Sequence, residues 1–250
     1  MRIHKQPPWI AGLFMLGGVL CGVADAQDDQ IARLSAALAA PERSAENKER
    51  DAARKPVEVI EFLGIEGGMT ALDIFAVGGW YTEVLSAAVG PTGKVYSQNP
   101  PFFLSRPGFV EAETERNERL GNVEPIHGEV ADAGIDGQVD VAITNQNLHD
   151  MYNRGGEAAA MPMIQGVYDA LKPGGVFGVM DHVGIAGQPN ADLHRMEVAA
   201  ARDLLVKAGF TIEAESDLLA NPADDHTRGP GDDSLGGNSD RFLIKARKPN

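Results

Sequence analysis

Short apolar runs alternate with amphipathic stretches through most of this chain. The runs are rich in Leu, Ile, Val and Phe, and the stretches between them carry apolar residues at helical spacing. Strands that alternate with helices are typical of a parallel sheet with helices on both faces. The pattern predicts seven strands, at 70–74, 93–97, 123–127, 139–144, 176–181, 210–215 and 240–246.

Helices are expected before and between these strands. The charged run 42–55 is interpreted as a solvated helix, with Glu46 and Arg50 one turn apart. Pro56 is expected to start the helix that leads into the first strand. The other predicted helices lie at 29–40, 109–119, 157–170 and 191–208.

The last two predicted strands are joined without a helix, across the Pro/Gly/Asp-rich run 220–239. Such a connection favours an antiparallel hairpin at the edge of the sheet. We therefore expect one α/β domain over residues 56–250, preceded by a helical segment at 27–55.

The first 26 residues have the pattern of a secretory signal peptide. Arg2 and Lys5 precede an apolar run, which ends at Ala24-Asp25-Ala26, a small-residue cleavage site. The alternative is an uncleaved membrane anchor, but the run is short for a membrane span. The pattern predicts a periplasmic or secreted protein without an integral span after processing.

Charge and cysteine content narrow the classes of partner. The chain of 250 residues carries a formal net charge of −14, which argues against nucleic acid or anionic membranes as partners. Cys21 is the one cysteine, so removal of residues 1–26 would leave no thiol and no disulfide.

The most informative stretch is 69–96, which combines a strand, a glycine turn, a helix and a second strand. Gly78 and Gly79 form the turn, just after Asp73 and Phe75 at the end of the strand. Backbone amides at such a helix start can face a nucleotide-like ligand. The alternative is a tight turn without a ligand.

With Leu171-Lys172-Pro173-Gly174-Gly175, this unit resembles the class I S-adenosylmethionine (SAM) methyltransferases over about residues 56–246. The chain is also similar to exported, predicted SAM-dependent methyltransferases of bacteria. That similarity is carried by Gly78-Gly79-Trp80-Tyr81-Thr82-Glu83, Asp181-His182, Asn221-Pro222-Ala223-Asp224-Asp225 and Asp240-Arg241-Phe242. The resemblance implies a Rossmann-like seven-stranded sheet with an antiparallel C-terminal hairpin, SAM as cofactor, and methyl transfer to a small molecule.

The resemblance also implies cofactor-binding residues. Counted from Asp73, the family's three glycine positions fall on Phe75, Val77 and Gly79, with Gly78 beside the last. Asn99 stands where the family has an acidic residue that binds the ribose hydroxyls.

Two further positions complete the implied cofactor site. After the third strand, Glu129 is the first choice and Asp132 the second for a contact with adenine. Asn145 ends the fourth strand at the crevice. All three, like Asn99, could instead be ordinary polar residues of turns and loops.

His149 and His182 follow the fourth and fifth strands, which should be neighbours in the sheet. Either could act as a general base, and Asp181 is its expected orienting partner, with His182 slightly favoured because Asp181 is adjacent. The alternative is a polar rim without a proton-transfer role.

His182, His194 and His226 with nearby carboxylates fit no metal-ligand spacing, so no metal is expected. The rival to an enzyme is a non-catalytic exported module that has lost or altered SAM binding.

Overall fold

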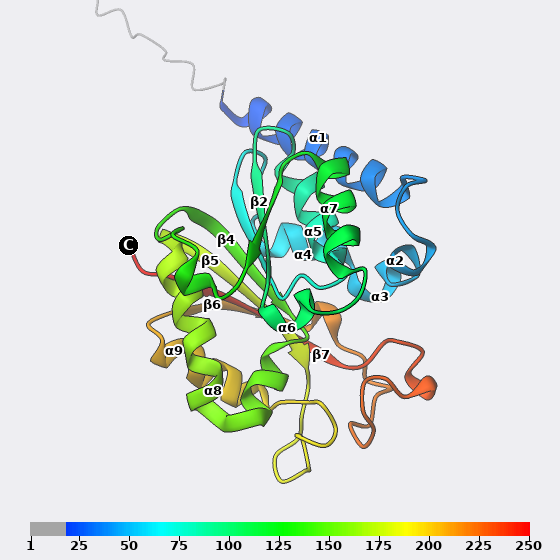
Figure 1. Ribbon diagram of the computed structural model, residues 1–250, viewed down its shortest axis with the longest axis vertical. Helices are drawn as coiled ribbons and strands as arrows, with labels where there is room; N and C mark the ends of the chain where they lie inside the picture. Colours follow the sequence, from blue (N-terminus) through cyan, green and yellow to red (C-terminus); the bar gives the residue numbers. More distant parts are fainter. Residues whose placement is uncertain (1–18) are drawn as a thin grey trace, which may run out of the picture.

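The protein is built on one seven-stranded sheet, in the order β3-β2-β1-β4-β5-β7-β6 (Figure 1). The computed structural model describes the backbone of residues 19–250 and the side chains from Asp29 onward. Strands β1 to β5 are parallel, and β7 is antiparallel to both of its neighbours. The strands are β1 (Thr70–Ile74), β2 (Lys94–Asn99), β3 (Val123–His127), β4 (Val139–Asn145), β5 (Leu171–His182), β6 (Thr211–Ser216) and β7 (Arg241–Arg247).

All seven predicted strands are confirmed, and so is the antiparallel C-terminal hairpin. The largest difference in extent is at β5, which begins at Leu171 instead of 176. Leu171 pairs with Val139, and a register shift then brings Val176 opposite Val141. The intervening Pro-Gly-Gly residues are thus taken up as an irregularity of the strand.

Helices cover both faces of the sheet, and successive side chains of each strand pack against opposite layers of helices. In β1, Ala71 packs with α1, α4 and α5, whereas Leu72 and Ile74 pack with α8 and α9. The helices are α1 (Val19–Ala39), α2 (Ala45–Glu49), α3 (Asp51–Arg54), α4 (Pro56–Leu63), α5 (Trp80–Val89), α6 (Pro101–Leu104), α7 (Phe109–Leu120), α8 (Leu148–Ala170) and α9 (Val198–Lys207), with single 3₁₀ turns at Val130–Asp132, Asp217–Leu219 and Asp233–Leu235.

Two predicted helices have other bounds. Helix α8 begins at Leu148, and non-helical backbone at Gly155 and Gly156 divides it, so that its second part corresponds to the predicted helix at 157–170. Helix α9 begins only at Val198, because Met196 pairs with the end of β5: its amide donates to the carbonyl of His182 (3.1 Å) and its carbonyl accepts from Gly184 (2.8 Å). The prediction of a helix from 191 was therefore wrong.

The run 42–55 is helical and largely exposed, as predicted, but it forms two short helices instead of one. The run forms α2 and α3, and Arg43 between α1 and α2 is 4% exposed. Its guanidinium donates to Glu83 of α5 and to Asp51 of α3. A buried arginine needs such carboxylate partners, so this segment is packed against the domain.

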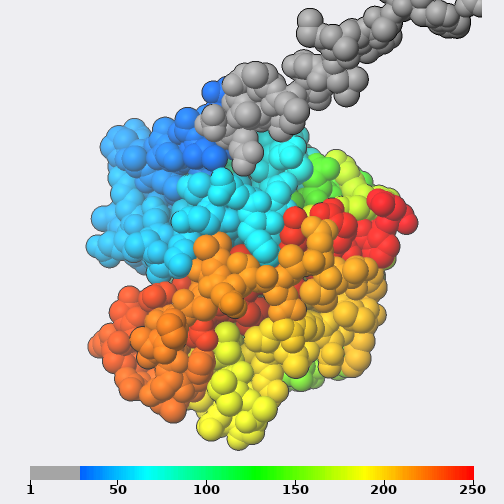
Figure 2. All heavy atoms as spheres, turned by 180° about the vertical axis from the view of Figure 1, so that it is seen from behind, coloured from blue at the N-terminus to red at the C-terminus, as the bar shows by residue number. Residues whose placement is uncertain are grey.

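On the face shown in Figure 2, the blue N-terminal segment meets the orange segment that precedes β7. Lys55 donates to the carbonyl of Leu218 (2.7 Å), and Arg241 of β7 donates to the carbonyl of Ala53 (2.8 Å). Residues from both ends of the chain therefore close one side of the sheet's carboxyl edge.

Residues 1–18 of the predicted signal peptide lie outside the described residues, and α1 runs through the predicted cleavage site. Among the helices in residues 19–250, none has the length and apolar character needed to cross a bilayer.

Candidate functional site

The turn after β1 has a glycine-like backbone at two residues that are not glycine. Phe75 (φ 53°) and Val77 (φ 46°) both lie in the left-handed region, which side chains other than glycine rarely adopt. The neighbouring strand holds them there: the amide of Phe75 donates to Gln98 Oε1 (3.1 Å) and that of Val77 to Asn99 Oδ1 (2.8 Å). Strain held in this way by surrounding contacts is frequent at ligand sites.

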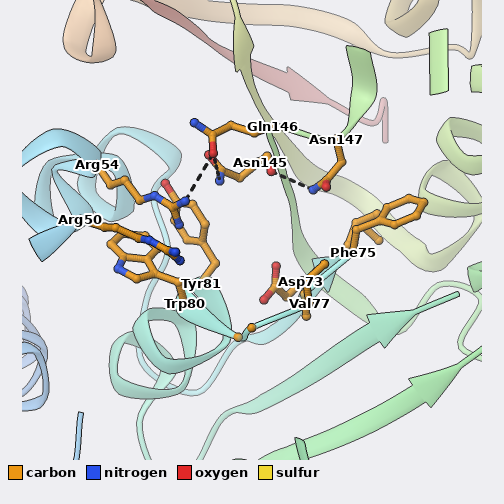
Figure 3. Close-up of a pocket in the computed structure, with 14 residues that line it drawn as sticks. Arg50, Arg54, Asp73, Phe75, Val77, Trp80, Tyr81, Asn145, Gln146 and Asn147 are labelled. Atoms are coloured by element: carbon orange, nitrogen blue, oxygen red, sulfur yellow. Dashed lines mark hydrogen bonds between the residues drawn. The ribbon is translucent and has the colours of Figure 1, made fainter. Parts of the chain in front are cut away.

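This turn forms the floor of a cavity of about 220 Å³ at the carboxyl edge of the sheet (Figure 3). The ends of β1 and β4, the start of α5 and the helix α3 enclose it. Its lining residues are Arg50, Arg54, Asp73 to Tyr81, and Asn145 to Asn147. A cavity at the carboxyl ends of parallel strands is where α/β folds bind ligands.

Charges of both signs line this cavity. Asp73 accepts a hydrogen bond from Thr82 Oγ1 (2.6 Å), and burial raises the pKa of its carboxyl to about 6. Arg54 lies over the ring of Trp80, 4.8 Å from its centroid, and donates to Gln146 Oε1 (3.3 Å). Burial lowers the pKa of this guanidinium to about 10, so it stays charged at neutral pH.

A second cavity, of about 510 Å³, adjoins the first and shares Phe75 and Asn147 with it. Phe102 and Phe103 of α6 form an aromatic wall, and Glu129 lies on its rim. Glu129, the first choice for an adenine contact, therefore lines this cavity, whereas Asp132 is exposed and does not line it. Asn145 lines the first cavity, and its Oδ1 has no hydrogen-bond partner.

Asn99 is not available to a ribose. Its side chain is fully buried, with Oδ1 accepting from the amide of Val77 and Nδ2 donating to Glu113 Oε1 at 2.8 Å. Both hydrogen-bonding ends of the amide are therefore used inside the protein. Asn99, predicted to contact the cofactor, lines neither cavity and instead fixes the Val77 turn.

The two glycines of the turn differ in their surroundings. A Cβ at Gly79 (φ 75°) would lie 2.2 Å from the guanidinium of Arg116, so Gly79 is required by packing. A Cβ at Gly78 would meet nothing within 4 Å, so Gly78 is the glycine that faces open space in the cavity.

Asp181 lies in β5, which is separated from β1 by β4, and it orients His149 and not His182. His149 Nδ1 lies 2.6 Å from Asp181 Oδ1, and the backbone amide of His149 donates to Asp181 Oδ2 (2.8 Å). Successive residues of a strand point to opposite faces, so Asp181 faces α8 while His182 faces away and contacts Ser239 (2.7 Å). Of the two pairings that the sequence left open, the structure has that of Asp181 with His149, and the slight preference for His182 was wrong.

The two imidazoles differ in basicity. Burial works against the charged form of His149, but the hydrogen bond and charge of Asp181 outweigh it and raise its pKa above the ordinary value. Burial lowers the pKa of His182 to about 3. Of the two, His149 is therefore the stronger base, and its side chain lies 5.4 Å from that of His182 between ring centroids.

The three histidines considered for a metal are not gathered together. His226 contacts Asp240 and His182 contacts Ser239, while His194 lies beside Asp150 and His149. Asp150 directly follows His149 on α8, and His194 comes from the turn between β5 and α9.

Sequence reasoning missed Arg50 and Arg54 as cavity residues. Their run 42–55 has the composition of a solvated helix, and its return to the cavity depends on packing across α5. Trp80 at the start of α5 is the one sequence signal for them, because a large aromatic ring there can be covered by a cationic side chain.

No protein-family model matches the chain, and neither does any curated protein sequence. Among solved structures, a SAM-dependent methyltransferase from Aquifex aeolicus is similar at 20% identity and a TM-score of 0.59, over 79% of this chain and 92% of that chain. A 1,6-didemethyltoxoflavin-N1-methyltransferase from Burkholderia thailandensis, with bound S-adenosylhomocysteine, is similar at 17% identity and a TM-score of 0.57, over 97% and 94%.

The [4+2]-cyclase SpnF is similar at 19% identity and a TM-score of 0.59, over 90% of this chain and 96% of that chain. At such identities the likeness shows the fold. The chain has the Rossmann-like fold of the class I SAM-dependent methyltransferases, with seven strands and an antiparallel C-terminal pair.

Proposed function

We propose that this protein binds SAM at the β1 turn and transfers its methyl group to a small-molecule acceptor. The observation that carries the proposal is the backbone of Phe75 and Val77, held in left-handed conformations beneath an open cavity. A glycine-like turn kept at the cost of strain indicates that the shape of the cavity floor matters to function.

The charges around the two cavities complement those of SAM. The cofactor carries a carboxylate, an ammonium and a sulfonium at one end and adenine at the other. Arg54 would pair with the carboxylate, while Asp73 would favour the cationic groups. The aromatic wall of the adjoining cavity, with Glu129 at its rim, suits adenine.

In the transfer, an acceptor lone pair forms a bond to the methyl carbon as the carbon–sulfur bond breaks, and S-adenosylhomocysteine leaves. A hydroxyl or amine acceptor also loses a proton, for which His149, oriented by Asp181, is the better placed base. The remaining work is to position the two reactants in line.

The direct test is calorimetry of the protein with SAM and with S-adenosylhomocysteine. Gly78→Val should weaken binding of both at least tenfold, because the new side chain enters open space in the cavity without meeting the fold. Gly67→Val is the matched control, since Gly67 is exposed, has ordinary backbone and lies away from this cavity. If the wild type, Gly78→Val and Gly67→Val bind SAM with equal affinity, SAM does not bind at this turn.

The burial of Asn99 favours a second candidate, a binding module without methyl transfer. Asn99 stands where the family has an acidic residue for the ribose and is used within the fold, so the cofactor contact there is weakened or altered. Binding of SAM without formation of S-adenosylhomocysteine in the presence of a broad acceptor set would favour this candidate.

We further propose that the protein acts in the periplasm or outside the cell after loss of residues 1–26. Cleavage after Ala26 would keep Gln30, which donates to the carbonyl of Ile65 (2.6 Å), and the buried Leu34. Mass spectrometry of the exported fraction should find Gln27 at the N-terminus, and an intact Met1 there would contradict the proposal.

A further inference from the structure

Three potential metal ligands converge between α8 and the turn that follows β5. One atom each of His149, Asp150 and His194 lies within 4.8 Å of the other two. His149 Nε2 is 3.3 Å from Asp150 Oδ1, and His194 Nδ1 is 3.1 Å from the same oxygen. Two donors bound about 2.1 Å from one zinc ion in tetrahedral geometry lie roughly 3.4 Å apart, so two of the three separations already suit a metal.

The carboxylate of Asp181 prepares His149 as a ligand. It is fully buried and contacts Nδ1, so the proton of the neutral ring is held on Nδ1 and the lone pair of Nε2 faces Asp150. A lone pair that faces a carboxylate oxygen is repelled unless a proton or a metal ion lies between them, so this position can hold either. A carboxylate behind a histidine in this way is the usual outer partner of a metal-bound imidazole.

The third ligand has a strained backbone that neighbouring contacts hold in place. His194 adopts a left-handed backbone (φ 50°), which is uncommon for a residue with a side chain. The next residue, Arg195, is fully buried and makes a bidentate pair with Asp224 (3.0 and 2.8 Å). Asn153 of α8 donates to the carbonyl of Arg195 (3.0 Å), which ties the turn to the helix that carries the other two ligands.

From this geometry we propose that His149, Asp150 and His194 form a binding site for one divalent transition-metal ion. Imidazole nitrogens favour zinc, iron, cobalt and nickel over magnesium or calcium. The set of two histidines and one carboxylate leaves coordination positions open, as in catalytic rather than structural sites.

A metal here would change how an acceptor is activated. The Nε2 lone pair of His149 cannot bind a metal and accept a proton at once. An acceptor oxygen bound to the ion would lose its proton more easily, since a divalent metal lowers the pKa of a bound oxygen. Asp150 also lines the larger cavity, so the ion would lie at its edge. This role rests on the proposed methyl transfer, whereas metal binding itself does not.

The test is a zinc titration of the chelator-treated protein by calorimetry, without SAM, so that failure of SAM binding has no bearing on it. We expect one zinc ion per chain and no competition from magnesium. His194→Ala and Asp150→Asn should each weaken zinc binding more than tenfold, and Asp181→Asn by about 10- to 100-fold. Cobalt in place of zinc should give visible absorption bands that His194→Ala abolishes.

His127→Ala is the matched control, because His127 contacts Glu113 outside this cluster, and its zinc affinity should equal that of the wild type. The ring of His194 is 66% exposed, so its removal should leave the melting temperature of the metal-free protein unchanged. Absence of stoichiometric zinc binding, or equal affinity in the wild type, His194→Ala and Asp150→Asn, would overturn the proposal.

Discussion

The carboxylate of Asp181 in β5 holds both the imidazole and the backbone amide of His149 at the start of α8. Nδ1 lies 2.6 Å from Oδ1, and the amide donates to Oδ2 at 2.8 Å. The amide of His182 donates to Oδ1 as well, at 2.8 Å. One buried carboxylate therefore fixes the place where β4 passes into α8, at the rim of the crevice.

Asp181→Asn should destabilise the protein by about 2 to 4 kcal/mol, because three buried donors then face a neutral amide with only one acceptor oxygen. Urea denaturation measures the change. Glu157→Gln is the control, since its pair with Lys207 is exposed and its loss should leave the midpoint unchanged. A midpoint for Asp181→Asn equal to that of the control would contradict this account of the rim.

Asn99→Asp should lower the free energy of unfolding by about 1 to 3 kcal/mol and should not tighten SAM binding. The new carboxylate would face Glu113 Oε1, to which the amide of Asn99 now donates at 2.8 Å. If Asn99 contacted the ribose, as the resemblance implies, Asn99→Asp would instead tighten SAM binding.

The double variant Asn99→Asp with Glu113→Gln is the sharper measurement. A glutamine amide can donate to the new carboxylate, so the pair should recover most of the stability lost in the single variant. Additive losses would mean that the two side chains do not interact as described.

The carboxyl of Asp73 should make stability fall as pH rises from about 4 to 6. An unfolded aspartate loses its proton near pH 4, whereas burial raises the pKa of Asp73 in the folded protein to about 6. Between these values the folded state binds more protons than the unfolded state. The effect of this one group is at most about 1.4 kcal/mol per pH unit.

Urea denaturation of the wild type and Asp73→Asn over this pH range isolates that effect, because other carboxylates titrate in both proteins. The unfolding free energy of the wild type minus that of Asp73→Asn should fall as pH rises from about 4 to 6 and level off above pH 6. A pH-independent difference would show that the carboxyl of Asp73 keeps its ordinary pKa in the folded protein.

Arg54→Ala should weaken SAM binding about tenfold or more, through loss of a charge-assisted hydrogen bond to the cofactor's carboxylate. Calorimetry measures it, with circular dichroism to confirm that the fold is kept. Arg202→Ala is the control, because Arg202 forms a pair with Glu215 on the exposed side of α9. Should both variants bind SAM equally well, the orientation proposed for the cofactor is wrong.

The succession of strands and helices along the chain and the position of the β1 turn can be predicted from the sequence alone. Burial of one face repeats every two residues in a strand and about every 3.6 in a helix, so the apolar positions of 70–74 or 139–144 reveal their elements locally. Gly79 reveals the turn in the same way, because its positive φ (75°) favours glycine.

The contacts between polar side chains, in contrast, depend on how the elements pack in three dimensions. Asp181 reaches His149 rather than its neighbour because the strand turns alternate residues to opposite faces, and α8 covers the face of Asp181. Asn99 is used within the fold because Val77 and Glu113 approach it from other elements. Arg54 reaches the cavity because the N-terminal segment packs back over Trp80. Such contacts join residues far apart in sequence, so they depend on packing that no local pattern of residues contains.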